Sequence, residues 1–92
     1  MKAVVTYELS TAPMDAILAA YPRHKALVDV FVARGEVLAI GTFAGSQDGP
    51  TGSMGIFKNR EAAESFVKQD PFVLEGLVGT YKIRDWNEIL LP

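Results

Sequence analysis

Residues 22–44, PRHKALVDVFVARGEVLAIGTFA, join the clearest helical pattern of the chain to its clearest strand pattern. Apolar side chains in residues 14–34 recur three and four positions apart, which is the period of a helix. They are Met14, Ile17, Leu18, Tyr21, Leu27, Val30 and Phe31. Pro22 interrupts this run, so we expect a short helical turn before it and a main helix that begins at Pro22. Gly35 is typical of a helix end, and residues 36–44 then predict a strand.

Three further strands are predicted on either side of this stretch. Residues 2–8 (KAVVTYE) are rich in β-branched residues, and residues 53–58 and 78–88 have similar short apolar patterns. The segment 45–52 contains three glycines and one proline. We therefore expect it to join the second and third strands as a hairpin with a long, flexible loop.

A second helix is predicted over residues 60–69, with Asn59 as its N-cap. Its buried stripe has helical spacing and consists of Ala62, Ala63, Phe66 and Val67. Asp70 and Pro71 then form the N-cap and first residue of a further helical turn, which Gly76 ends.

The resulting order, β-α-β-β-α-β, predicts a ferredoxin-like α+β fold: a four-stranded antiparallel sheet with two helices on one face. The length of 92 residues fits a single domain over residues 1–92.

Two of the predicted strands are apolar on both sides. In the first, Val4 and Thr6 alternate with Ala3, Val5 and Tyr7; in the second, Leu38 and Ile40 alternate with Val37, Ala39 and Phe43. Because two helices can cover only one face of the sheet, we expect a second copy of the chain to cover the other, in a homodimer. The alternative is a monomer whose outer face is half apolar, as many protein surfaces are.

Composition excludes several classes of partner and cofactor. The net charge is -2 and no run of Lys or Arg occurs, so we expect neither nucleic acid nor an anionic membrane as a partner. Without cysteine, and with one histidine, a metal site would rest almost wholly on carboxylates, and we expect no metal. Residues 49–52 (GPTG) lack the Lys-Ser/Thr of a phosphate loop, and no other cofactor motif occurs, so we expect no cofactor. The strand pattern begins at residue 2 and no apolar stretch reaches the ~20 residues of a membrane span, which favours a soluble cytoplasmic protein.

The predicted topology brings His24 and Asp70 to the same end of the fold. Strand directions place the start of the first helix, the loop 45–52 and the end of the second helix together. A carboxylate bound to one imidazole nitrogen fixes the tautomer and stabilises the imidazolium, which makes the other nitrogen a general base or acid. The serines stand in no nucleophile elbow, so proton transfer is favoured over covalent catalysis.

Alternatives remain open for each of these residues. His24 could be an ordinary surface side chain, and Asp70 has a complete local explanation as an N-cap. Four further residues are predicted to form the wall of a substrate pocket, although aromatic side chains at such positions serve the core as often. They are Tyr7, Phe43, Ser53 and Phe72.

At these residues the chain resembles the YCII-related (YciI-like) family, and the resemblance runs over nearly all 92 residues. The matching motifs are Arg23-His24, Gly35-Glu36-Val37-Leu38, Gly41-Thr42-Phe43, Gly52-Ser53, Glu61-Ala62, Asp70-Pro71-Phe72 and Gly76-Leu77. The resemblance implies a ferredoxin-like protomer that pairs into a dimeric α/β barrel. It also implies a candidate catalytic His/Asp pair, which maps onto His24 and Asp70.

The chain departs from the family pattern in two places. The family often has a Gly-Pro pair where this chain has Gly41-Thr42, and its arginine often stands two or three residues before the histidine, whereas Arg23 is adjacent to it. Arg23 is therefore not assigned to the site. A dehydrochlorinase of chlorinated aromatic breakdown products resembles this plan, so the resemblance implies lyase or isomerase chemistry on a small organic acid.

The sequence thus predicts a small homodimeric enzyme in which His24, oriented by Asp70, moves a proton on a small cyclic or unsaturated substrate. Two alternatives remain: a non-catalytic module that binds a small ligand or assists another enzyme, and a purely structural dimer.

Overall fold

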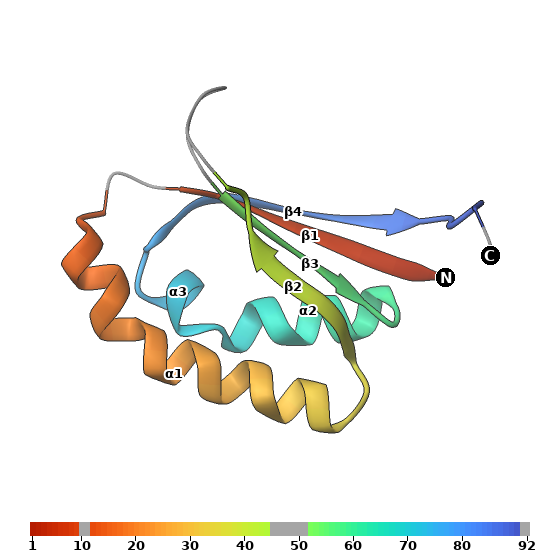
Figure 1. The fold of residues 1–92 in the computed structure, drawn as a ribbon, viewed down its shortest axis with the longest axis horizontal. Coiled ribbons are helices and arrows are strands. Elements are labelled where there is room, and N and C mark those ends of the chain that lie inside the picture. Colours follow the sequence, from red (N-terminus) through yellow and green to blue (C-terminus); the bar gives the residue numbers. More distant parts are fainter. Residues whose placement is uncertain (10–11, 45–51, 91–92) are drawn as a thin grey trace.

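The computed structural model describes residues 1–9, 12–44 and 52–90 and contains the predicted four-stranded antiparallel sheet with its helices on one face (Figure 1). The elements are β1 (Lys2–Leu9), α1 (Met14–Ala33), β2 (Val37–Thr42), β3 (Gly52–Phe57), α2 (Arg60–Gln69), α3 (Pro71–Leu74) and β4 (Val78–Trp86). The strand order is β2-β3-β1-β4 with every neighbouring pair antiparallel, which confirms the ferredoxin-like topology. Most of the predicted hairpin loop, residues 45–51, lies outside the described residues.

The expectation that Pro22 separates a short turn from the main helix is wrong. α1 is one continuous helix with Pro22 in its interior. Proline costs a helix the hydrogen bond to the carbonyl four residues earlier, but Pro22 lies on the exposed side, where water can satisfy that carbonyl. Packing on both sides of the proline holds the helix together, since Ala20 before it and Phe31 after it are both completely buried.

The predicted C-terminal end of α1 and the predicted N-cap of α2 are both present. Gly35 has a φ of 70° at the end of α1, and its N–H and that of Glu36 return to the carbonyls of Val32 and Phe31, which is the Schellman arrangement. The Asn59 side chain accepts a hydrogen bond from the N–H of Ala62 at 2.8 Å and begins α2.

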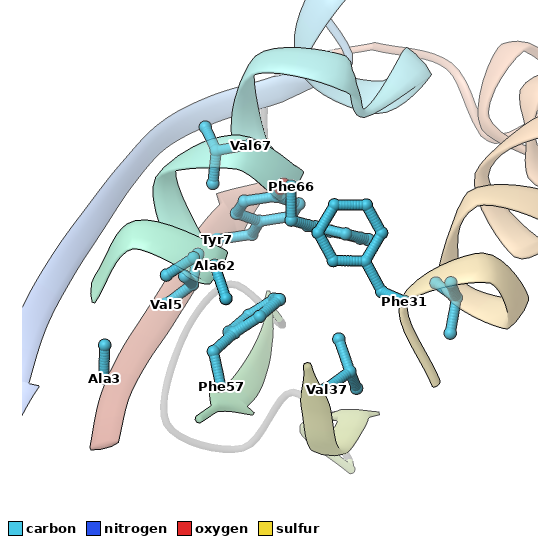
Figure 2. Packing of buried hydrophobic residues seen from close by; sticks show 11 residues of the cluster. Ala3, Val5, Tyr7, Phe31, Val37, Phe57, Ala62, Phe66 and Val67 are labelled. Carbon is cyan, nitrogen blue, oxygen red and sulfur yellow. The ribbon is translucent and has the colours of Figure 1, made fainter. Parts of the chain in front are cut away.

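The hydrophobic core lies between the sheet and the helices (Figure 2). Its buried side chains are Ala3, Val5, Tyr7, Val28, Phe31, Val37, Phe57, Ala62, Ala63, Phe66 and Val67. The predicted stripe of α2 supplies four of these. Within the described part of the chain, no helix is both long enough and apolar enough to cross a membrane.

The side-chain alternation predicted for the second strand is wrong. The pairing of β2 with β3 shifts register between Val37 and Ala39, so Leu38 is the extra residue of a bulge. Beyond the bulge every side chain changes face, because the period of a strand is two residues. Val37 and Ile40 consequently both lie toward the helices, whereas simple alternation had placed them on opposite faces.

The outer face of the sheet, on the side away from the helices, has an apolar centre. Val4, Met54 and Ile56 lie there and are half-buried, and Trp86 on β4 is 39% exposed. No helix of the described chain covers this face (Figure 1).

Candidate functional site

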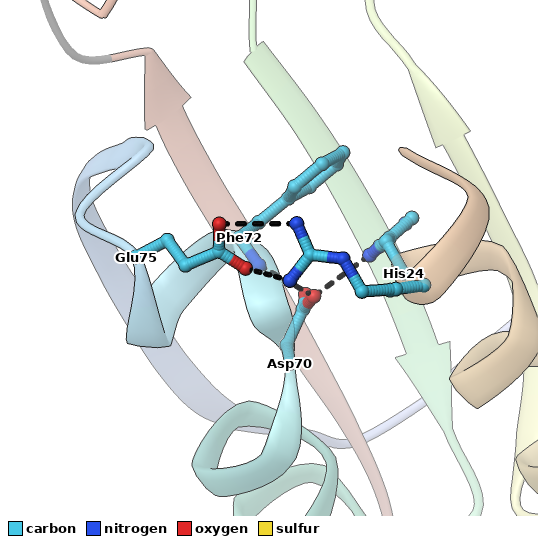
Figure 3. A network of polar contacts seen from close by, with 5 residues as sticks. His24, Asp70, Phe72 and Glu75 are labelled. Carbon is cyan, nitrogen blue, oxygen red and sulfur yellow. Dashed lines mark hydrogen bonds and ion pairs between the residues drawn. The ribbon is translucent and has the colours of Figure 1, made fainter. Parts of the chain in front are cut away.

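The structure brings His24 and Asp70 into direct contact. His24 lies in α1 and Asp70 lies between α2 and α3, and the imidazole Nδ1 is 2.8 Å from the carboxylate Oδ1 (Figure 3). The Asp70 side chain has no exposed surface, whereas 12% of the His24 side chain is exposed. The carboxylate is therefore shielded from solvent, and the imidazole is the member of the pair that is accessible to a ligand.

Local chain geometry explains the position of Asp70. Its backbone is extended, its N–H closes α2 on the carbonyl of Phe66, and Pro71 begins α3 directly after it. Its Oδ1 accepts the N–H of Phe72 at 3.0 Å as the N-cap of α3. The same oxygen faces His24, so the cap and the pair share one acceptor atom.

A third donor reaches Asp70 from the sheet. The Tyr7 hydroxyl on β1 donates a hydrogen bond of 2.8 Å to Oδ2. Burial, followed by the negative charge of Asp70 and this hydrogen bond, raises the pKa of Tyr7 above its ordinary value of about 10. The phenol is thus held in its protonated, donating form.

These contacts favour the tautomer of His24 that carries its proton on Nδ1. With Phe72 and Tyr7 both donating to it, the carboxylate acts as acceptor, and Nδ1 of His24 is the third donor. A neutral imidazole with its proton on Nδ1 carries its free lone pair on Nε2. Nε2 is therefore the nitrogen that can act as a base toward the cavity that His24 lines.

Aromatic rings fix the orientation of the imidazole. The ring of Phe72 stacks on it at 4.1 Å between centroids with an angle of 10° between planes. The Phe66 ring meets it edge-on at 6.1 Å, and the Tyr21 ring lies at the same distance at a tilt. Such contacts each stabilise a given ring pose by roughly 0.5–1.5 kcal/mol.

A cavity of about 410 Å³ lies between α1 and the β2–β3 end of the sheet, with His24 in its wall. This volume falls within the range of small-molecule sites. Most of the lining is apolar or aromatic, and polar side chains are few. Besides Tyr7, whose hydroxyl donates to Asp70, those that could orient a ligand are Tyr21, His24, Lys25, Thr42 and Ser53.

Three of the four predicted wall residues, Tyr7, Ser53 and Phe72, line this cavity together with His24. The structure does not bring Phe43 to it: that side chain follows β2, is 50% exposed and is not among the lining residues. The bulge earlier in β2 explains the difference, because it gives Thr42, the partner of Ser53, the inward position.

Sequence reasoning missed Tyr21 and Thr42 as lining residues. Tyr21 precedes His24 by three positions, so helical spacing could have placed both on one face. Thr42 could have been found only with the bulge known.

A second link joins the helices beside the site. Arg23 binds Glu75 through its two terminal guanidinium nitrogens, and this pair connects α1 to the end of α3 on the exposed surface (Figure 3). The hydrogen bond from Arg23 lowers the pKa of Glu75, and Glu75 in turn raises the pKa of Arg23. Across residues 1–9, 12–44 and 52–90, no group of three His, Cys, Asp or Glu side chains is placed to hold a metal ion.

Comparison with known proteins agrees with this architecture. The model of the YCII-related domain matches residues 1–87, and the chain belongs to that family. No functionally curated protein matches the sequence.

Two solved structures share the fold. The first is 5-chloro-2-hydroxyhydroquinone dehydrochlorinase (TftG) from Burkholderia phenoliruptrix AC1100, in complex with 2,5-dihydroxybenzoquinone. It is similar over 95% of this chain and 94% of its own, with a TM-score of 0.76 and 22% identity. The second is SnoaB, a cofactor-independent oxygenase from Streptomyces nogalater, similar over 97% of this chain and 94% of its own, with a TM-score of 0.56 and 13% identity.

Proposed function

We propose that this protein is a small enzyme in which His24, oriented by Asp70, transfers a proton on a small cyclic or unsaturated substrate, in an elimination or isomerisation. The observation that carries the proposal is the 2.8 Å contact between the two side chains in the wall of a cavity of about 410 Å³. A general base must face its substrate and be oriented by a partner, and the place of His24 in the cavity wall and its contact with Asp70 support this role.

The reaction begins when Nε2 takes a proton from the substrate, either from a hydroxyl group on a conjugated ring or from a carbon next to an electron-withdrawing group. The resulting imidazolium is stabilised by the buried carboxylate of Asp70, while the electron pair of the broken O–H or C–H bond moves into the conjugated system of the substrate. In an elimination that pair expels a leaving group such as halide, and the imidazolium then gives its proton to water. In an isomerisation, the imidazolium returns the proton to a different atom.

The lining of the cavity and the structural neighbours both favour a flat ring as substrate. Phe72 and Phe66 offer aromatic surface beside His24, while Thr42 and Ser53 offer hydroxyls that can hydrogen-bond to oxygen substituents. One neighbour is named as the dehydrochlorinase of a chlorinated hydroxyhydroquinone and is complexed with a quinone, and the other is named as a cofactor-independent oxygenase.

The test is release of halide from a chlorinated hydroxyquinol, measured for the wild type, His24→Gln and Glu75→Gln. Glutamine keeps a polar side chain at position 24 but cannot serve as a base, so activity should fall by about 10²-fold or more. Glu75→Gln, a matched change on the exposed surface, should retain activity. Full activity in His24→Gln would refute the proposal.

The alternative function is ligand binding without turnover. It predicts that 2,5-dihydroxybenzoquinone raises the thermal midpoint of the wild type, that His24→Ala and Asp70→Ala weaken this effect, and that no product forms. A purely structural protein would show neither binding nor turnover.

A homodimer is the proposed assembly, and the cytoplasm remains the predicted location. The apolar centre of the outer sheet face, with Val4, Met54 and Ile56, supports pairing because a second copy would remove it from water. Sedimentation should give a species of twice the 10.0 kDa chain mass, and Ile56→Lys should shift it toward the monomer. A wild-type species of 10.0 kDa at micromolar concentration would contradict this assembly.

A further inference from the structure

We propose that Tyr7 is a positioning residue, whose hydroxyl holds the Asp70 carboxylate in the orientation that fixes the proton and the ring of His24. The inference rests on the proposed function for its catalytic meaning and deepens it by adding a third member to the pair. Its geometry rests on contacts alone: Tyr7 donates to Oδ2, the oxygen that neither His24 nor the N–H of Phe72 uses.

The hydrogen bond from Tyr7 restrains the Asp70 carboxylate. Oδ1 of Asp70 accepts two hydrogen bonds and Oδ2 accepts one, from Tyr7. A carboxylate bound at both oxygens cannot turn about its Cβ–Cγ bond without breaking contacts. Because Asp70 has no exposed surface, Oδ2 would lose its partner if the phenol were absent, and a buried acceptor without a partner is costly.

The position of Tyr7 suits a positioning role. It lies on the central strand β1, opposite Ser53 of β3 and Tyr81 of β4, so its backbone is held on both sides. The edge of its ring meets the ring of Tyr81 at 6.5 Å between centroids. A group on a central strand is placed more precisely than one on a loop, and precision is what an orienting contact requires.

The consequence concerns the tautomer of His24. A free neutral histidine favours the proton on Nε2, which would leave no lone pair for the cavity. Asp70 reverses that preference by accepting from Nδ1, and it can do so fully only while Oδ1 is held toward the ring. Tyr7 therefore acts on the base through Asp70, without contact with the reacting atoms.

The experiment is ¹⁵N NMR of the histidine ring in the full chain, for the wild type, Tyr7→Phe and Tyr81→Phe. The sequence contains one histidine, so both ring signals belong to His24 without assignment. In the wild type Nδ1 should carry the proton. In Tyr7→Phe the ratio of Nδ1–H to Nε2–H tautomer should fall about threefold, the equivalent of roughly half of one typical net hydrogen bond.

Tyr81→Phe is the matched control, because it removes a hydroxyl from the neighbouring ring and should leave the ratio unchanged. Wild-type ring signals in a folded Tyr7→Phe protein would overturn the proposal. So would a change in affinity for 2,5-dihydroxybenzoquinone without any change of tautomer, since that result would make Tyr7 a substrate-contacting wall residue only.

A measurement on the wild type keeps the proposal testable if Tyr7→Phe does not fold. The hydroxyl proton of Tyr7 should give a resonance that exchanges slowly with water, and its absence would overturn the proposal. None of these NMR measurements needs a substrate. Failure of the Tyr7 proposal is therefore distinguishable from failure of the enzyme proposal, which the halide assay with His24→Gln decides.

Discussion

Removal of the Asp70 side chain should destabilise this protein more than removal of any other charged side chain in the described part of the chain. Asp70 is the one buried charged residue there, and it accepts hydrogen bonds from Tyr7, His24 and the N–H of Phe72. In Asp70→Ala all three donors lose their acceptor at once.

The size of the effect follows from those contacts. An unsatisfied buried donor costs ~1–3 kcal/mol, and the adjoining cavity lets water replace part of the loss, so we expect Asp70→Ala to cost ~3–5 kcal/mol. A domain of this size has a total free energy of unfolding of only ~5–14 kcal/mol. The thermal midpoint should therefore fall by about 12 °C or more.

Asp70→Asn gives a sharper comparison. The N–H of Phe72 can only donate, so the amide oxygen must keep the place of Oδ1, and the amide NH₂ then faces Tyr7. A hydroxyl can accept as well as donate, so Tyr7 reverses its role and every polar group keeps a partner. The charge is lost but the contacts remain, and we expect a cost of only ~1–2 kcal/mol.

The assay is urea unfolding at pH 7 and one fixed protein concentration, which matters if the protein dimerises. Asp29→Ala is the control, because Asp29 pairs with Lys25 on the exposed surface of α1 and should be nearly silent. The reasoning fails if Asp70→Ala unfolds as the control does. It also fails if Asp70→Asn is as unstable as Asp70→Ala, since the contacts rather than the charge should dominate.

Three further predictions concern pH, backbone packing and the surface ion pair. Because burial and the adjacent carboxylate raise the pKa of Tyr7, the unfolded chain loses this proton near pH 10 while the folded chain keeps it. The free energy of unfolding should thus fall as pH rises above about 10, and it should fall less steeply in Tyr7→Phe. If the urea midpoint depended on pH in the same way in the wild type and in Tyr7→Phe, this prediction would be contradicted. Gly52→Ala should lower the free energy of unfolding by ~1–3 kcal/mol, because the added Cβ would lie 2.3 Å from the carbonyl oxygen of Tyr7. Gly41→Ala is the control: the space around Gly41 is open, so this variant should unfold like the wild type in the same urea assay. The hydrogen bond from Arg23 lowers the pKa of Glu75. The Arg23–Glu75 pair should therefore stabilise the protein at pH values above the ordinary glutamate pKa. This stabilisation should be lost as the pH falls through the lowered pKa of Glu75. Glu75→Gln should therefore flatten the thermal midpoint between pH 6 and pH 3, and an unchanged acid profile would count against the pair.

Much of the fold could be predicted from the sequence because its signals are local. The Schellman end at Gly35, the cap at Asn59 and the apolar stripe of α2 each depend on a few neighbouring residues. The two errors depended on tertiary packing. Pro22 is tolerated because buried residues on both sides hold α1, and the bulge at Leu38 appears only when β2 is paired with β3.

The candidate site likewise has one contact that follows from the chain order and others that depend on tertiary packing. The contact between His24 and Asp70 follows from strand directions and helix ends, which are set by the chain order alone. The hydrogen bond from Tyr7 depends on side-chain reach across the core, and no spacing along the sequence encodes it. Thr42 lines the cavity in place of the predicted Phe43 because a single extra residue changes the face of every position after it.

The structure also changes how the two sequence-based interpretations of Asp70 relate to each other. An N-cap for α3 and a partner for His24 looked like alternatives, but Oδ1 accepts from the N–H of Phe72 and from Nδ1 of His24 together. The hydrogen bond from the N–H of Phe72 fixes the position of Oδ1, and Oδ1 then orients the imidazole. The N-terminus of α3 therefore contributes to the arrangement that would make His24 a base. A substitution that keeps the cap and removes the charge, such as Asp70→Asn, therefore separates the two roles better than any truncation does. A protein that stayed folded in that variant but lost proton transfer would show that the negative charge, and not the helix end, drives the chemistry.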